Sequence, residues 1–278
     1  MNPPPFRLLV LDIDGTLLTS EKKISSRTRA AIAAARARGV RLVLATGRRY
    51  PSALPVAEDL GGEVPLVLHN GALVIERGEV IRCRPLPRAV AVRSIDLARE
   101  RGLDPVVHCG QEGEGRLLVE AGARKAGLIA HYLERSAAHV EEVEDAAALT
   151  EDPMQVMLGG GPAEMQGLQA DLERTLCGDA RIERTVYPRA GVEILDILHQ
   201  EVGKATAVAF LQKRYGLLAR ETLAIGDNWN DREMLEQAGQ GFVMGGADEG
   251  LRRLGLPVLP TCDEDGVAVA LDSVFGTI

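Results

Sequence analysis

Two aspartates one residue apart follow the first apolar run of the chain, and a glycine comes directly after them. In FRLLVLDIDGTLLTS, Asp12 and Asp14 end a run that reads as a buried strand. Because side chains alternate along a strand, both carboxylates point to the same side of the extended chain. Gly15 allows a sharp turn and the close approach of a ligand. One carboxylate could attack a substrate while the other handles a proton, provided that something relieves the repulsion between them.

Polar residues also end three further apolar runs. Ligands of open parallel sheets bind outside the carboxyl ends of the strands, so we expect these residues to share one rim with the first pair. Three carboxylates on one rim favour a hard cation with oxygen ligands, and Mg²⁺ suits carboxylates combined with water and a phosphate. The ordinary alternative is a solvated acidic rim. The residues at these strand ends are Thr46, Gly47 and Arg48, then Asn70, and finally Asp227.

An anion at this rim would find partners in the same stretches. Thr46 supplies a hydroxyl and Gly47 an unobstructed backbone N–H before a helix, which is a common anion site. Lys204 stands near the start of the predicted helix GKATAVAFLQKRYG, where a cation opposes the helix dipole. A lysine at that position often points into water. Beside the acidic rim it is better interpreted as a phosphate clamp and a counter-charge to Asp12.

The order of the elements predicts how these residues are positioned. Apolar runs alternate with helical stretches up to residue 82 and again from residue 189, where VEILDIL reads as the first returning strand. This pattern predicts an α/β core with a doubly wound parallel sheet, built from 1–82 and 189–278. The middle has a different texture, with a proline-bracketed linker, RPLPRA, and a glycine- and glutamate-rich loop. We therefore predict an inserted α+β domain over 83–188.

Composition narrows the class of protein. The chain has 278 residues and a net charge of -8, which argues against a nucleic-acid partner. The first residues lack the features of a signal peptide, and no apolar stretch approaches a membrane span, so we expect no membrane partner. Four scattered cysteines are typical of reduced thiols in the cytosol. We expect a cytoplasmic protein, and the sequence does not indicate its oligomeric state.

The motifs DIDGTLL, ATGR, the later lysine and GDNWND resemble the four motifs of the haloacid dehalogenase superfamily. HNGALV after the second motif, the insertion between the second and third, and the tail TCDEDGVAVAL are similar to its Cof-type (type IIB) sugar-phosphatase branch. The resemblance implies a Rossmann-like core, an α+β cap over the site, Mg²⁺ dependence and hydrolysis of phosphate monoesters. Glu201 and Gly246 differ from that branch, which affects the expected substrate contacts rather than the carboxylate motifs.

The resemblance also implies a role for each matching residue. Asp12 would attack phosphorus and form an aspartyl-phosphate, which splits one difficult displacement into two. Asp14 would protonate the leaving alkoxide and later take a proton from water. Thr46, Gly47 and Lys204 would hold the phosphate, and Asp12, the backbone carbonyl of Asp14 and Asp227 would bind the metal. Asn70 and Asn230 would contact the substrate. Arg48 and Asp231 would form the surrounding shell.

Two other functions fit the same aspartates. A phosphomutase keeps the pair but returns the phosphoryl group to the sugar, and a receiver-type signalling domain accepts a phosphoryl group without being a phosphatase. The expected partner is a small phosphorylated metabolite, most simply a sugar phosphate, with a phosphorylated vitamin or a nucleotide-derived monoester also open. We interpret His69 and His108 as structural, and residues 110–116 as a surface loop.

Overall fold

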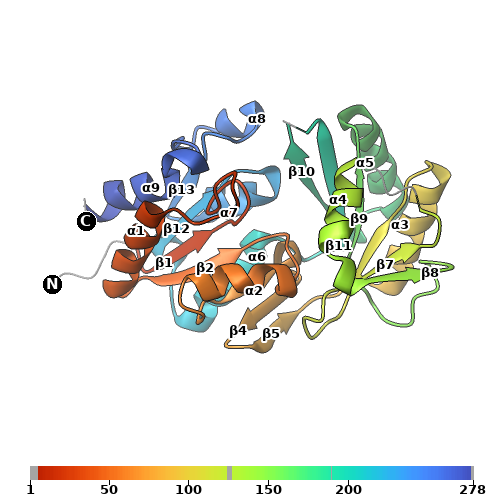
Figure 1. Cartoon of the computed structure of the whole chain (residues 1–278), viewed down its shortest axis with the longest axis horizontal. Helices are drawn as coiled ribbons and strands as arrows, with labels where there is room; N and C mark the ends of the chain where they lie inside the picture. Colours follow the sequence, from red (N-terminus) through yellow and green to blue (C-terminus); the bar gives the residue numbers. More distant parts are fainter. Residues whose placement is uncertain (1–5, 124–126, 189, 277–278) are drawn as a thin grey trace.

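The computed structural model describes residues 6–123, 127–188 and 190–276. The chain forms two units, each built on its own sheet, with the first and last described elements in the first unit and the middle of the chain in the second (Figure 1). Within the described residues, no helix is long and apolar enough to cross a membrane.

The first unit contains a seven-stranded sheet in the order β13-β12-β1-β2-β3-β4-β5. The strands from β13 to β3 are parallel, whereas β4 and β5 are added antiparallel. The strands are β1 (Leu8–Leu11), β2 (Arg41–Ala45), β3 (Leu66–Leu68), β4 (Leu73–Glu76), β5 (Glu79–Cys83), β12 (Thr222–Gly226) and β13 (Gln240–Val243).

Helices cover both faces of this sheet because its strands are apolar on both sides. Leu9 and Leu11 of β1 pack in one cluster with residues of α1, α2 and α9. Leu8 and Val10 pack in the other cluster, with residues of α6, α7 and α8. The predicted doubly wound α/β core is confirmed. These helices are α1 (Ser26–Ala37), α2 (Tyr50–Asp59), α6 (Lys204–Tyr215), α7 (Arg232–Gln237), α8 (Glu249–Arg252) and α9 (Gly266–Phe275).

The second unit contains a six-stranded sheet in the order β10-β11-β9-β6-β7-β8. Helices α3 (Arg88–Glu100) and α5 (Pro162–Leu176) pack on one face, and α4 (Gly127–Arg135) packs on part of the other. The strands are β6 (Val106–Cys109), β7 (Arg116–Glu120), β8 (Val140–Val143), β9 (Gln155–Gly160), β10 (Ala180–Tyr187) and β11 (Val192–His199). In the residues that the structure describes, the short 3₁₀ helices are η1 (His69–Gly71), η2 (Ala137–His139), η3 (Ala219–Glu221), η4 (Trp229–Asp231) and η5 (Cys262–Glu264).

The strand β11 corrects the predicted return to the core. The prediction began the returning segment at residue 189, which lies outside the described residues, and assigned VEILDIL to the first sheet. Instead β11 pairs antiparallel with β9 and β10 in the second sheet. We therefore place the return between His199 and Lys204. The run misled because it is apolar on both faces: Leu195 packs under the helices of the second unit, and Leu198 joins the core cluster of the first.

Candidate active site

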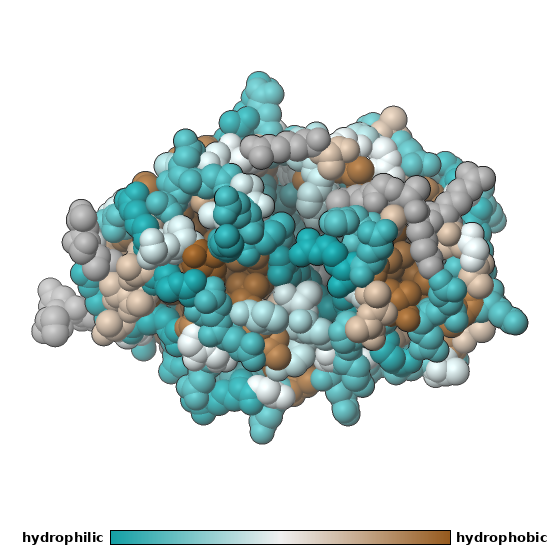
Figure 2. Space-filling view, in the orientation of Figure 1, coloured by the Kyte–Doolittle hydropathy of each residue, from teal (hydrophilic) through white to brown (hydrophobic). Residues whose placement is uncertain are grey.

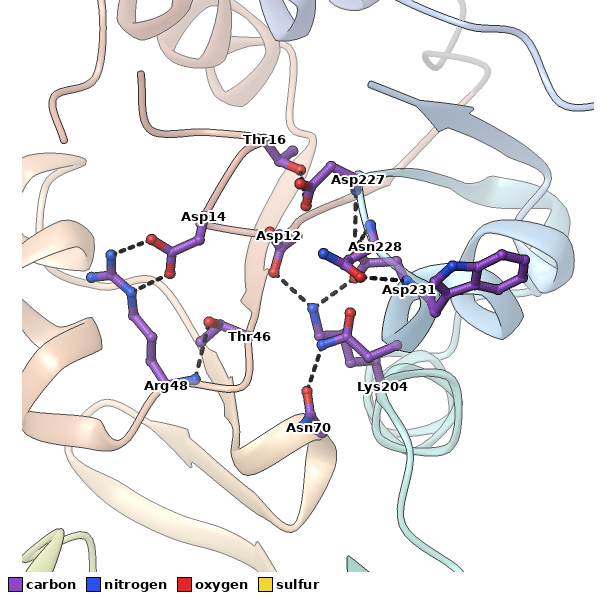
Figure 3. Close-up of polar contacts among 12 residues, drawn as sticks. Asp12, Asp14, Thr16, Thr46, Arg48, Asn70, Lys204, Asp227, Asn228 and Asp231 are labelled. Carbon is purple, nitrogen blue, oxygen red and sulfur yellow. Dashed lines mark hydrogen bonds and ion pairs between the residues drawn. The ribbon is translucent and has the colours of Figure 1, made fainter. Parts of the chain in front are cut away.

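Asp12 and Lys204 form a buried ion pair at the carboxyl end of the sheet. Asp12 follows β1, and its backbone N–H donates to the carbonyl of Ile225 in β12 at 3.0 Å, so the two strands end side by side. Lys204 begins α6 and is 1 % exposed. Its Nζ lies 2.7 Å from Asp12 Oδ1 and 2.6 Å from Asp231 Oδ1 (Figure 3). The lysine therefore contacts two carboxylates that lie far apart in the sequence and offsets part of their charge.

The charges of this pair depend on each other. Burial raises the pKa of Asp12 to about 7, although the ammonium of Lys204 opposes the rise. Burial alone would lower the pKa of Lys204, but the two carboxylates that it contacts raise it above its ordinary value. The lysine is thus held charged, and it helps to keep an oxygen of Asp12 available as an anion.

Asp227 faces Asp12 across the rim, as predicted. The carboxylates of Asp12, Asp227 and Asp231 each bring an oxygen within 4.8 Å of the others. Gly15 has a φ of 80°, and a Cβ there would lie 2.1 Å from Asp227 Oδ2, so this close approach requires glycine. Burial, followed by the charges of Asp12 and Asp231, raises the pKa of Asp227 well above its usual range.

Asp231 is already committed to protein partners. Its Oδ1 accepts from Lys204, and its Oδ2 accepts from the backbone N–H groups of Asp227 and Asn228, each at 3.1 Å. It therefore shapes the loop after β12. In the described part of the chain, no positive side chain pairs with Asp227. Asp227, together with the Oδ2 of Asp12 that is not bonded to Lys204, offers oxygen ligands that fit a hard cation such as Mg²⁺.

Asp14 points away from Asp12 and toward Arg48 (Figure 3). Its carboxylate accepts from Arg48 Nε at 2.6 Å and from a terminal nitrogen of Arg48 at 2.8 Å, a bidentate pair. Lys22, which sequence reasoning missed, donates to it at 2.9 Å. Burial alone would raise the pKa of Asp14, but Arg48 and Lys22 outweigh burial and lower it to about 2. Arg48, predicted in the surrounding shell, therefore holds Asp14 as an anion.

Thr46 and Gly47 form a tight loop after β2. Thr46 is buried, and its Oγ1 accepts from the backbone N–H of Arg48 at 3.1 Å, which leaves the hydroxyl proton available to an anion. A Cβ on Gly47 would lie 3.2 Å from Asn70 Oδ1. The loop and Asn70 are therefore in close contact, as an anion site made of both would require.

Asn70 connects this rim to the second unit. Its Nδ2 donates to Asp196 Oδ2 at 2.9 Å, and its Oδ1 accepts from Asn230 Nδ2 at 2.8 Å. Gln155 Nε2 donates to Asp196 Oδ1 at 2.8 Å, and His69 Nδ1 lies 3.3 Å from Gln155 Oε1. The predicted Asn70 and Asn230 thus meet each other. Sequence reasoning missed Asp196 and Gln155, although an acidic residue inside the apolar run VEILDIL was the available signal.

Further hydrogen bonds join the second unit to the first. Arg49 is buried and donates to Tyr132 Oη at 3.0 Å, to Ser136 Oγ at 2.7 Å and to the carbonyl of Gly115. The loop 110–116, predicted to lie on the surface, therefore packs partly against the first unit. Hydrophilic side chains gather along the junction of the two units (Figure 2). His108 is buried beside His69, with ring centroids 5.5 Å apart.

Fold and comparison define the class together. The core is a doubly wound α/β unit that carries an inserted second unit, with acidic side chains and a buried lysine at the rim of its sheet. Residues 9–271 match the model of the haloacid dehalogenase-like hydrolases, and the chain belongs to this family.

Known proteins resemble the chain along nearly its whole length. The chain is 30 % identical over 266 residues to the HMP-PP phosphatase of Serratia proteamaculans. The aligned region covers 95 % of this chain and 93 % of that protein. A putative phosphatase of Haemophilus influenzae is 26 % identical over 272 residues, with coverage of 97 % and 98 %. A haloacid dehalogenase-like hydrolase from Bacteroides thetaiotaomicron has a similar structure, with a TM-score of 0.79, 27 % identity and coverage of 97 % and 100 %. The predicted superfamily, Cof-type branch and phosphatase class are confirmed, and the roles of single residues stay predictions.

Proposed function

We propose that this phosphatase depends on Mg²⁺ and hydrolyses a small phosphate monoester, with a sugar phosphate as the expected substrate, through an aspartyl-phosphate on Asp12. The observation that carries the proposal is the buried pair of Asp12 and Lys204, 2.7 Å apart at the rim of the sheet. A carboxylate that the protein desolvates and partly neutralises is suited to attack an anionic phosphoryl group. The relative named HMP-PP phosphatase supports a small phosphorylated metabolite as the substrate.

The reaction would proceed in two displacements. In the first, an oxygen of Asp12 bonds to phosphorus, the bond from phosphorus to the alkoxide breaks, and Asp14 gives the alkoxide a proton. In the second, water attacks phosphorus, Asp14 takes its proton, and the bond to Asp12 breaks to release phosphate. Thr46 and Gly47 would hold the phosphoryl oxygens, and Lys204 would offset the negative charge that gathers around Asp12.

Asp14 can donate a proton only after it acquires one. Arg48 and Lys22 bind its carboxylate and lower its pKa, with burial acting in the opposite direction, to about 2. A bound phosphoryl group carries up to two negative charges and competes for the same cations. We propose that substrate draws Arg48 and Lys22 away from Asp14, which raises the pKa of Asp14 toward the range of a general acid.

The residues of the rim fit a metal ion. Asp12 and Asp227, with the backbone carbonyl of Asp14, would hold Mg²⁺. When bound, the ion would neutralise the rim and stabilise the charge of the phosphoryl oxygens. This role also explains why Gly15 brings the backbone so close to Asp227.

A phosphate-release screen tests the proposal. The purified protein is given a panel of monoesters that includes sugar phosphates and p-nitrophenyl phosphate, with Mg²⁺ and with chelator. We expect inorganic phosphate from at least one sugar phosphate, loss of release in chelator and recovery with added Mg²⁺. A phosphomutase would convert the sugar phosphate without net release, and a signalling domain would only become labelled. Absence of release from every monoester contradicts the proposed function.

A further inference from the structure

The turn that follows β3 has an unusual backbone. His69 and Asn70 have φ angles of 48° and 53°, so two successive residues other than glycine occupy the left-handed region. L-residues with side chains rarely adopt this region, and a buried turn of this kind persists when surrounding contacts hold it. His69 is 1 % exposed and Asn70 is fully buried. The contacts that hold the turn must therefore come from protein groups packed against it.

Besides Asn230 and backbone carbonyls of the first unit, two side chains of the second unit contact this turn. Asp196 Oδ2 accepts from Asn70 Nδ2 at 2.9 Å, and Gln155 Oε1 lies 3.3 Å from His69 Nδ1. Gln155 Nε2 donates to Asp196 Oδ1 at 2.8 Å, so the carboxylate fixes the orientation of both amide groups. Within the described residues, Asp196 has no cationic partner and is bound by neutral amides. Burying this carboxylate without a cation lowers the free energy of unfolding, so its presence indicates a role other than stability.

The positions of Asp196 and Gln155 in their strands explain why they reach the first unit. Their neighbours Leu195, Ile197 and Val156 pack under α3 and α5. Because side chains alternate along a strand, Asp196 and Gln155 lie on the opposite face of the sheet. That face meets the turn of the first unit, as the bonds of Asp196 and Gln155 to Asn70 and His69 show.

The 69–70 turn is itself hydrogen-bonded to loop 46–48, which we propose to bind the phosphoryl group. The backbone N–H of Asn70 donates to the carbonyl of Thr46 at 3.0 Å, and that of His69 donates to the carbonyl of Arg48 at 3.1 Å. The Oδ1 of Asn70 also lies close enough to Gly47 that a Cβ there would be 3.2 Å away. A displacement of the turn would therefore displace the backbone of the whole loop.

We propose that Asp196 and Gln155 are positioning residues, which hold the 69–70 turn from the second unit and thereby set the phosphate-binding loop 46–48. The inference rests on the proposed function, because it takes Thr46 and Gly47 as phosphate contacts. The two residues act through Asn70 and His69, so the affinity for any phosphoryl group depends on them, whatever the leaving group. A residue that recognised the leaving group would instead affect one substrate more than another.

The test uses the full-length Asp196→Ala protein. Vanadate serves as a phosphate analogue, its binding is measured by calorimetry, and kcat/KM is measured on p-nitrophenyl phosphate and on a sugar phosphate. We expect vanadate affinity and both kcat/KM values to fall together by about 10- to 100-fold, the loss typical for hydrogen bonds to a charged group. The Tm should fall by only a few degrees, because losing a buried carboxylate without a cation offsets part of the cost of leaving the amides of Asn70 and Gln155 unpaired.

A matched carboxylate provides the control. Asp179 is an exposed acid of the second unit that pairs with Arg93, so Asp179→Ala should leave vanadate affinity and kcat/KM within twofold of the wild type. Gln155→Ala should repeat the losses of Asp196→Ala, and it carries the test if Asp196→Ala does not fold.

A double-mutant cycle distinguishes positioning from a general structural role. If Asp196 acts through Asn70, the protein with both Asp196→Ala and Asn70→Ala should be no worse than Asn70→Ala alone, within about twofold. Losses that multiply in the double variant, or unchanged vanadate affinity in both Asp196→Ala and Gln155→Ala, would overturn the inference. A wild-type protein that binds vanadate but hydrolyses no monoester would instead contradict the proposed function. The inference would then be decided by vanadate affinity alone, compared between the wild type and the variants.

Discussion

The substitution Lys204→Met should strongly destabilise the protein. Methionine nearly fills the volume of the lysine stem but leaves Asp12 and Asp231 without the ammonium that lies 2.7 and 2.6 Å from them. Both carboxylates are buried, so water cannot replace the lost bonds. Removing one partner of a buried ion pair typically costs about 3–5 kcal/mol. At about 2–4 °C per kcal/mol, the expected fall in Tm is roughly 6–20 °C.

The matched control is Lys213→Met, on the same helix. Lys213 is exposed, so its loss should change the free energy of unfolding by no more than about 0.5 kcal/mol. Calorimetric unfolding of both variants, in chelator and at one pH, measures the difference. Turnover of Lys204→Met should also disappear, because Asp12 loses the cation that favours its charged form. A Lys204→Met protein as stable as Lys213→Met would refute the reasoning that this lysine neutralises the rim.

Three further substitutions test the rim. Gly15→Ala places a carbon 2.1 Å from Asp227 Oδ2 and should lower kcat/KM about 100-fold, whereas Gly39→Ala, also at positive φ but with open space around it, should not. Asp227→Ala should raise the Mg²⁺ needed for half-maximal rate by about tenfold or more, and full activity in chelator would exclude the metal. Asp14→Asn should slow hydrolysis of a sugar phosphate about 10²–10⁴-fold. It should still give a rapid-quench burst of p-nitrophenol from p-nitrophenyl phosphate, because that leaving group needs no proton. Equal slowing on both substrates without a burst would mean that Asp14 only supports the structure of the site.

The architecture of the rim could be predicted because it depends on local patterns. Strands that are apolar on both faces must be covered on both faces, and parallel strands deliver their carboxyl ends to one edge. Asp12 and Asp227, 215 positions apart by their numbers, therefore lie within reach of one cation. The paired contact of Lys204 with Asp12 follows from the same convergence.

The contacts between the two units could not be predicted, because they depend on how one sheet is oriented against the other. VEILDIL is apolar in both possible sheets, so its pattern does not distinguish them, and β11 was assigned wrongly. Asp196 and Gln155 meet Asn70 and His69 only through that orientation. The bidentate pair of Arg48 with Asp14 was also beyond the pattern, since it depends on side-chain conformation.

The measurement that tests the central claim most directly is the trapping of the phosphoryl group on the protein. Asp14→Asn is mixed with p-nitrophenyl phosphate that carries radiolabelled phosphate, quenched in acid within milliseconds, digested and sequenced by mass spectrometry. The account predicts acid-stable label on the peptide that contains Asp12. It predicts neither label nor turnover in the protein that carries both Asp14→Asn and Asp12→Asn. Phosphate release without label on that peptide, together with Asp12→Asn turnover within tenfold of the wild type, would contradict a covalent intermediate at Asp12.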